Sequence, residues 1–243
     1  MTGRTTAIVL AAGAGSRFGG GKLLASLGGR PVLQHVLDRL AQAGLEDVVV
    51  VLGDDADAIE AAIAWRGERR VRNPEPARGL SSSLQVGIAA VAGGVGAVLI
   101  MLGDQPHVSA AAIRAVLDAG VTAERPIAAP AYVGDGGRNP VLLGREAFVL
   151  VEAAEGDRGL GPIIAAHPEL VHEVPIPPDA APDGNPDIDT RADLVAMLET
   201  AWAARVHANN AQDDRYREPP DGTDFYAPVT SLFRADPTRT DEP

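Results

Sequence analysis

The chain has 243 residues, of which 46% are hydrophobic, and it carries a formal net charge of −12 and no cysteine. This length and apolar content predict one sizeable core with an appendage, and the acidic balance excludes general nucleic-acid binding, which depends largely on lysine and arginine. Without cysteine there can be no disulfide, thiolate nucleophile or cysteine-ligated zinc, so a metal would need oxygen or histidine ligands, which favours magnesium.

The apolar runs of the sequence are short compared with the roughly 18 to 20 residues that a membrane-spanning helix needs. The first run, residues 7–15, is interrupted by glycines and is preceded by Arg4 as its only basic residue. This is a poor match to a signal peptide. We therefore expect a soluble, cytoplasmic protein that has no membrane partner.

Apolar runs rich in β-branched residues alternate with amphipathic segments in the first half of the chain. The predicted buried strands are residues 6–10, 47–52, 97–102 and 126–131. The predicted helices between them are residues 31–43, 84–91 and 109–119. This alternation predicts an α/β fold with a doubly wound, mostly parallel, Rossmann-like sheet. Ligands bind such sheets beyond the carboxyl ends of the strands, where we expect the polar loops 13–22 and 103–107.

The second half of the chain continues the pattern less regularly. Two further strands are predicted at residues 139–143 and 170–176, and helical segments at residues 145–154 and 160–166. Thr190, followed by Asp193 three residues later, resembles a capping box that opens a helix to about residue 206. We expect the packed domain to span residues 1–206. Residues 207–243 are proline-rich and polar, which predicts an irregular tail or linker with one helical turn near 229–233.

The first motif that carries chemistry is AIVLAAGAGSRFGGGK at residues 7–22, where a buried strand runs into a glycine-rich loop. Small residues let backbone N–H groups approach phosphate oxygens, and Arg17 and Lys22 supply positive charge. A dinucleotide fingerprint is excluded because position 18 is Phe, and a P-loop because no Gly-Lys is followed by Ser or Thr. The alternative is an ordinary strand-to-helix turn with basic residues on its surface.

The second motif, LIMLGDQPHV at residues 99–108, places Asp104 at the carboxyl end of a predicted strand. An exposed carboxylate there can bind a magnesium ion that bridges phosphates. Alternatively, Asp104 caps the helix that begins near Ser109, although Ser109 itself is better placed for capping.

Two further segments add polar groups. In RGLSSS at residues 78–83, Gly79 allows close backbone approach, and Ser81 and Ser82 offer hydroxyls to a base or phosphate, unless the serines only cap a helix. In DIDTRAD at residues 187–193, two carboxylates are spaced so that both face one side of an extended segment, and one could complete a metal site with Asp104. The alternative is the acidity usual at helix starts.

Five motifs, LAAGAGSRFGGGK, RNPEPARGLSSSL, LGDQP, GRNPVLLGREAF and DIDTRADL, together resemble the molybdenum cofactor cytidylyltransferases, within the MobA-like NTP transferase superfamily. The resemblance covers about residues 6–200, in family order and with similar spacing. It implies a nucleotidyltransferase with a glycosyltransferase-A-type sheet that moves CMP from CTP to the molybdopterin cofactor, releases pyrophosphate and uses Mg²⁺.

The resemblance also implies roles for individual residues. Arg17, Lys22 and Asp104 would be catalytic, with Arg17 and Lys22 on the phosphates. Asp104 would bind the magnesium ion, and Asp189 would support the metal or the acceptor. The implied nucleotide-binding residues are Leu10, Ala11, Ala12, Gly13, Gly15, Gly79, Leu80 and Ser81.

Donor and acceptor identity rest on finer points of the resemblance. The pair Ala11-Ala12 is similar to the cytidylyl enzymes, whereas guanylyl relatives tend to have LAGG there, so we expect CTP rather than another NTP. The segment GDRGLGPII departs from a family pattern similar to GDVGAR, which bears on acceptor identity, and the chain after about residue 203 has no family counterpart.

The resemblance implies a molybdopterin-type acceptor and transient contact with a molybdoenzyme or its chaperone. Two alternatives stay open: a nucleotidyltransferase acting on a sugar phosphate or another small phosphorylated metabolite, and a non-catalytic module that binds nucleotide or cofactor and delivers it. The presence of Arg17, Lys22 and Asp104 together favours an enzyme.

Overall fold

The computed structural model describes residues 4–200 except 92, 134–136 and 182–184. The chain divides into two units, residues 1–198 and 199–243, and the expected tail with its helical turn lies outside the described residues. The helix expected to begin at Thr190 is present at residues 191–200, and 200 is the last described residue. In the described part, no helix is long and apolar enough to cross a membrane.

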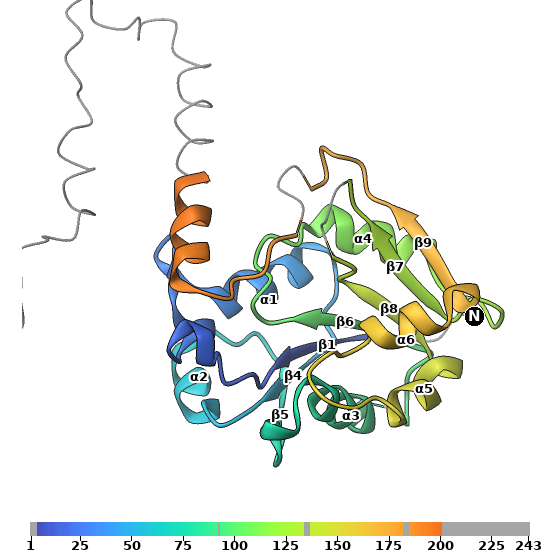
Figure 1. Cartoon of the computed structure of the whole chain (residues 1–243), viewed down its shortest axis with the longest axis horizontal. Coiled ribbons are helices and arrows are strands. Elements are labelled where there is room, and N and C mark those ends of the chain that lie inside the picture. The colour runs from blue at the N-terminus through green and yellow to red at the C-terminus, as the bar shows by residue number, and fades with distance from the viewer. Residues whose placement is uncertain (1–3, 92, 134–136, 182–184, 201–243) are drawn as a thin grey trace, which may run out of the picture. The chain divides into compact units, whose positions relative to one another are not determined.

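A seven-stranded sheet with the strand order β5-β4-β1-β6-β8-β7-β9 forms the centre of the first unit (Figure 1). All of its strands run in one direction except β8, which is antiparallel to both of its neighbours. This confirms the predicted mostly parallel α/β sheet. The strands are β1 (Thr5–Ala11), β4 (Val48–Leu52), β5 (Arg69–Arg72), β6 (Ala97–Leu102), β7 (Ile127–Ala131), β8 (Val141–Gly144) and β9 (Val171–Pro175). A separate small hairpin joins β2 (Ser26–Leu27) to β3 (Arg30–Pro31).

Helices cover both faces of the sheet, as Figure 1 shows. One face carries α1 (Val32–Gln42), α2 (Ala56–Ala62) and α4 (Ala110–Ala119). The other carries α3 (Leu80–Val91), α5 (Phe148–Glu152) and α6 (Gly161–Ala166). Short 3₁₀ turns are η1 (Ser16–Phe18), η2 (Lys22–Leu24), η3 (Pro76–Arg78), η4 (Arg145–Ala147) and η5 (Pro168–Leu170).

Each face of the sheet has its own hydrophobic core, because successive side chains of a strand point to opposite faces. In β1, Ala7 and Val9 pack with α1 and α4, whereas Ile8 and Leu10 pack with α3. The central strands are apolar on both faces, which is why they appear in the sequence as continuous apolar runs. Their burial fixes the sheet, and their carboxyl ends meet along one edge; in Figure 1 the arrowheads of β1 and β6 point the same way.

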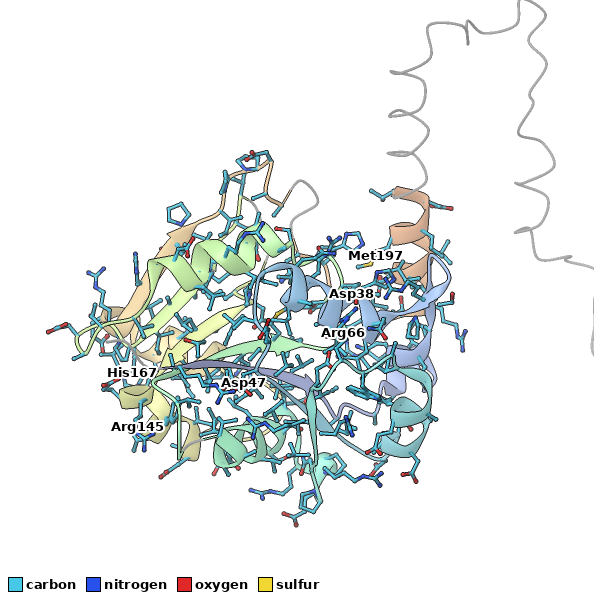
Figure 2. All side chains as sticks on the ribbon, turned by 180° about the vertical axis from the view of Figure 1, so that it is seen from behind. Asp38, Asp47, Arg66, Arg145, His167 and Met197 are labelled. Carbon is cyan, nitrogen blue, oxygen red and sulfur yellow. The ribbon has the colours of Figure 1, made fainter. Side chains whose placement is uncertain are left out.

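A third cluster holds the segments that cover this edge. Phe18 and Val32 pack with Ile188 and Met197, so the loop after β1 lies against the segment that follows β9. Met197 is labelled in Figure 2. The expected capping box is confirmed: the N–H of Thr190 donates to Oδ2 of Asp193 at 2.6 Å, and the N–H of Asp193 donates to Oγ1 of Thr190 at 3.3 Å.

An ion-pair cluster fixes α1 against its neighbours. Asp38 on α1 pairs with Arg30 on β3 at 2.6 Å and with Arg66, which follows α2. Asp38 and Arg66 are labelled in Figure 2. Burial alone would raise the pKa of Asp38, but the hydrogen bonds from Arg66 and Gln34 and the nearby positive charges outweigh burial and lower it. The cluster thereby ties the β2–β3 hairpin, α1 and the chain after α2 together.

Some predicted boundaries were wrong. The helix expected at 84–91 begins at Leu80, so the three serines lie in its first turns, where they are buried. The amide of Asn73 donates to the hydroxyls of Ser82 and Ser83 at 2.8 and 3.0 Å, which allows their burial. The segment expected as one helix at 145–154 is a 3₁₀ turn followed by α5. The short elements α2, β5 and the β2–β3 hairpin had not been predicted.

We expect Gly87→Ala to destabilise the protein, although alanine normally favours a helix over glycine by about 1 kcal/mol. A Cβ at Gly87 would lie 2.5 Å from Cγ2 of the fully buried Ile8 and 3.2 Å from Cγ2 of Val51. The overpacking should cost about 1–3 kcal/mol, measured by urea unfolding. Gly161→Ala is the control, because a Cβ there meets nothing within 4 Å. Equal stability of the two variants would contradict this packing.

Candidate active site

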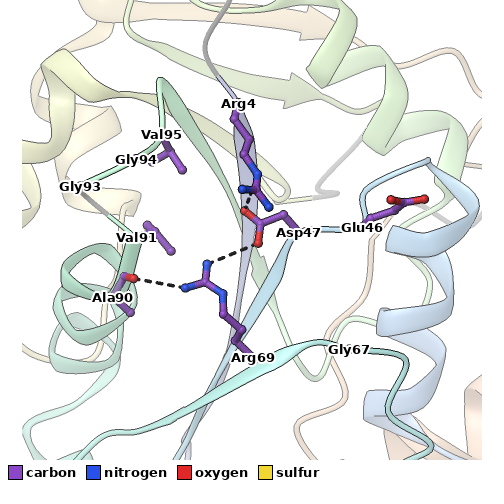
Figure 3. Close-up of a pocket in the computed structure, with 10 residues that line it drawn as sticks. All are labelled: Arg4, Glu46, Asp47, Gly67, Arg69, Ala90, Val91, Gly93, Gly94 and Val95. Atoms are coloured by element: carbon purple, nitrogen blue, oxygen red, sulfur yellow. Dashed lines mark hydrogen bonds and ion pairs between the residues drawn. The ribbon is translucent and has the colours of Figure 1, made fainter.

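Two hollows lie at opposite edges of the sheet. The one in Figure 3, about 710 Å³, lies at the amino ends of the strands. There Asp47 pairs with Arg4 at 3.2 Å and with Arg69 at 3.4 Å, and it also accepts a hydrogen bond from Thr6. Arg4, Asp47 and Arg69 are therefore engaged with one another, and we interpret them as an ion-pair cluster that joins the starts of three strands.

The second hollow, about 560 Å³, lies at the carboxyl ends of β1 and β6, where ligands bind in parallel α/β sheets. The residues that line it come from five separate segments of the chain. They are Leu10, Ala11, Ala12, Gly13, Ala14, Gly15, Ser16, Arg17, Lys22, Leu23, Pro76, Ala77, Arg78, Gly79, Leu80, Ser83, Leu102, Asp104, Gly156, Asp157 and Asp189. The structure thus brings together every site residue predicted from the sequence except Ser81.

The glycine-rich loop forms one wall of this pocket. Gly15 adopts a φ of 57°, and a Cβ there would lie only 3.2 Å from Cβ of Lys22, so the loop backbone packs directly against the stem of that side chain. Ala12 is closely approached by Gly53, where a Cβ would meet the carbonyl oxygen of Ala12 at 2.5 Å. Gly53 therefore supports the loop from outside, a role that its place after a predicted strand did not reveal.

Four charged side chains converge at the end of the pocket near this loop. Nζ of Lys22 lies 2.5 Å from Oδ2 of Asp104 and 3.5 Å from Oδ1 of Asp189. Nη1 of Arg17 lies 2.6 Å from Oδ2 of the same Asp189. Lys22 is mostly buried, with 13% of its side chain exposed, whereas Arg17 is 74% exposed. Two cations and two carboxylates from three distant segments thus form one chain of ion pairs.

A third carboxylate, that of Asp187, interacts with this group. Asp187 accepts a hydrogen bond from Nε2 of Gln105, a buried residue that the sequence analysis did not single out. Burial raises the pKa of Asp187, and the negative charges of Asp104 and Asp189 act in the same direction, against the hydrogen bond from Gln105 and the charge of Lys22. Gln105 belongs to the motif LGDQP and directly follows Asp104, so the sequence could have identified it as a candidate site residue.

The opposite wall joins two loops. Gly79 adopts a φ of 92°, and a Cβ there would lie 2.6 Å from the carbonyl carbon of Gly156, so the two backbones touch. The N–H of Leu80 donates to Oδ1 of Asp157 at 3.2 Å, and the N–H of Ser81 donates to the carbonyl of Gly156 at 3.0 Å. Ser81 is itself buried, so its backbone supports the wall while its hydroxyl does not line the pocket.

The carboxylates fit a divalent cation of the hard, oxygen-binding kind. Asp104 and Asp189 both reach the ammonium of Lys22, so their oxygens converge on one point already occupied by a positive charge. Among the described residues, no three His, Cys, Asp or Glu side chains are grouped as metal ligands. Magnesium typically takes one or two carboxylates, with substrate phosphates and water as its remaining ligands, and this pair meets that requirement.

Comparison with known proteins gives a consistent result. The family model described as the MobA-like NTP transferase domain matches residues 7–171. The bifunctional protein GlmU of Sphingopyxis alaskensis is 41% identical over 120 residues, which cover 49% of this chain and 26% of that protein. The GlmU of Bordetella petrii is 26% identical over 216 residues, covering 86% of this chain and 42% of that protein. The chain thus spans less than half the length of these curated relatives.

Solved structures match over a larger share. The crystal structure of Rv0371c from Mycobacterium tuberculosis has a TM-score of 0.69 and 31% identity, covering 82% of this chain and 100% of that one. A structure of Rv0371c in complex with manganese has a TM-score of 0.67 and 30% identity, covering 81% of this chain and 99% of that one.

We expect Arg17→Ala and Lys22→Ala each to weaken the binding of a nucleoside triphosphate by roughly ten- to a hundredfold, because each would remove a cation from the end of the pocket where we expect the phosphates. Isothermal titration calorimetry measures the affinity. Arg125→Ala, which removes an exposed arginine remote from the pocket, should leave it unchanged. Wild-type affinity in both pocket variants would show that the phosphates do not bind at this end.

Proposed function

The chain belongs to the MobA-like NTP transferase domain family, a family of nucleotidyltransferases, and we propose that it transfers CMP from CTP to the molybdopterin cofactor with release of pyrophosphate. The observation that carries this proposal is the convergence of Lys22, Arg17, Asp104 and Asp189 beside the glycine-rich loop. One pocket then offers backbone groups and cations to a triphosphate, and carboxylates to a cation.

The donor lies along the pocket in this proposal. Its triphosphate takes the end formed by Gly13, Gly15, Arg17 and Lys22, and its base takes the wall formed by Gly79 and Leu80. The preference for CTP rests on the pair Ala11-Ala12, which resembles the cytidylyl enzymes. Leu10, Ala11 and Ala12 line the pocket at the end of β1, where their positions are fixed by the burial of that strand.

The reaction requires an in-line displacement at phosphorus. An oxygen of the acceptor's terminal phosphate forms a bond to the α-phosphorus of CTP, the bond from that phosphorus to the bridging oxygen breaks, and pyrophosphate leaves with the electron pair. Lys22 and Arg17 stabilise the negative charge that grows on the phosphate oxygens. Before nucleotide binds, the pairs with Asp104 and Asp189 keep both cations at the end of the pocket where the phosphates are proposed to bind.

Asp104 and Asp189 would hold the divalent cation, magnesium in this proposal. When bound, such an ion neutralises charge on the phosphates and orients them. The likeness to Rv0371c, which was crystallised with manganese, is consistent with a divalent cation.

A sugar phosphate or another small phosphorylated metabolite is the second candidate acceptor. The observation that favours it is the 41% identity with a protein named GlmU, confined to about half of this chain. Asp187 and Asp189 lie beyond residues 7–171, so the family match does not include the segment that supports the metal or the acceptor in this proposal. A non-catalytic delivery module is disfavoured by the presence of Arg17, Lys22 and Asp104 together in one pocket.

The deciding experiment measures pyrophosphate release with each of the four NTPs, with molybdopterin, with a sugar 1-phosphate, and without acceptor. We expect the fastest release with CTP and molybdopterin. Release that depends on a sugar phosphate instead would establish the second candidate. If no NTP and acceptor release pyrophosphate, while CTP binds, a delivery module would remain and the proposed transfer would be wrong.

We expect Asp104→Asn to lower the rate of transfer by roughly a hundredfold or more, because it removes charge from the cation site. The fold should persist, because the side chain of Asp104 lies at the pocket. The hydrogen bond between Asp104 and Ile188 uses the backbone carbonyl of Asp104, which accepts from the N–H of Ile188 and is unchanged in the variant. The rate is measured at saturating Mg²⁺, with the exposed Asp118→Asn as control. Activity within threefold of wild type would refute the assignment of Asp104.

A further inference from the structure

Lys22 is the only lysine in the sequence; of the 21 basic residues, the other 20 are arginine. Every other basic position is therefore occupied by a guanidinium, a broad planar group with donors in a fixed fork. An ammonium is instead a compact, nearly spherical charge on a flexible four-carbon stem. The single lysine stands at the point in the pocket where two carboxylates meet.

The surroundings of Nζ are those of a small cation. Oδ2 of Asp104 lies at 2.5 Å and Oδ1 of Asp189 at 3.5 Å, and the side chain is mostly buried. The stem of Lys22 packs against Gly15, so the ammonium lies between the glycine-rich loop and the carboxylates. A divalent cation bound to the same two carboxylates would be within a few ångströms of this ammonium, and the two like charges would repel strongly.

We propose that Lys22 fills the cation site of the nucleotide-free protein as an internal cation, and that a divalent cation enters only when a triphosphate draws the ammonium away. The inference rests on the proposed function, which supplies the triphosphate and the cation. Arg17, Lys22 and the loop line one pocket, so phosphate oxygens bound at the loop would give the ammonium a new partner.

Two consequences follow. Before nucleotide binds, the carboxylates are neutralised, which avoids the cost of packing negative charges together without a partner. Once nucleotide binds, Lys22 leaves the cation site. The phosphates of the nucleotide then offer further oxygen ligands to a divalent cation. Nucleotide and cation therefore bind as a coupled pair, with a favourable coupling free energy that includes the release of Lys22.

The test measures binding of Mn²⁺ alone, by electron paramagnetic resonance of the free ion, to wild type, Lys22→Met and Arg17→Met without nucleotide. Lys22→Met keeps the length of the stem and removes the charge. We expect it to bind Mn²⁺ at least about tenfold more tightly than wild type. Arg17→Met should change the affinity by less than about threefold, because that guanidinium is exposed and, among the described residues, its one ion pair is with Asp189.

Two further variants keep the experiment decisive. Lys22→Gln should behave as Lys22→Met and serves if the latter does not melt cooperatively. Adding Asp104→Asn to the Lys22 variant should abolish the gain, which places the bound Mn²⁺ at this site. The inference is overturned if neither Lys22 variant binds Mn²⁺ more tightly than wild type, or if Arg17→Met gains as much as Lys22→Met.

The outcome is independent of transfer, because no acceptor is present. A gain in Mn²⁺ affinity in a protein that releases no pyrophosphate with any NTP would refute the proposed function and leave the internal cation standing. Normal transfer with no gain in the Lys22 variants would refute the internal cation alone.

Discussion

The ion pairs of Lys22 with Asp104 and Asp189 are the interaction on which the candidate site depends. They join residues 82 and 167 positions apart in the sequence. Lys22 lies at the end of the glycine-rich loop, Asp104 lies at the end of a central strand, and Asp189 lies just before a capped helix. In the nucleotide-free protein these opposite charges bring the three segments to one point, while the hydrophobic cores beneath keep the strand ends fixed.

Much of this arrangement follows from local sequence. The central strands were predictable because both faces are buried, so their sequences are continuously apolar, and parallel strands bring their carboxyl ends to one edge. The loop after β1 and Asp104 after β6 were therefore predictable as neighbours. The assignment of Asp189 to the group needed three things together: its spacing from Asp187, the presence of Asp104 and the family resemblance.

Other features depend on contacts that no local pattern records. The edge strand β5 has the sequence RRVR, and three of its four residues are exposed, so it lacks the apolar signal of a strand. Serines usually favour helix starts, yet Ser82 and Ser83 are buried in α3 because Asn73, the residue directly after β5, supplies their hydrogen bonds. The departure at 156–164 was visible in the sequence, but its contact with Gly79 is purely tertiary.

The reversed strand β8 has a consequence for how the site can diverge. Val141 pairs with Ile100 and Gly144 with Ala97, so the chain enters β8 at the edge that carries the pocket and leaves it at the opposite edge. The chain then returns through α5 and places Gly156 and Asp157 against Gly79 and Leu80. Because β8 is reversed, the loop after α5 lies at the pocket. If β8 were parallel to its neighbours, the loop after α5 would lie at the opposite edge of the sheet. Because the segments that flank β8 lie outside the hydrogen-bonded ladder, their length and sequence can change without disturbing the pairing of the strands, so this wall of the pocket can be altered independently of the sheet.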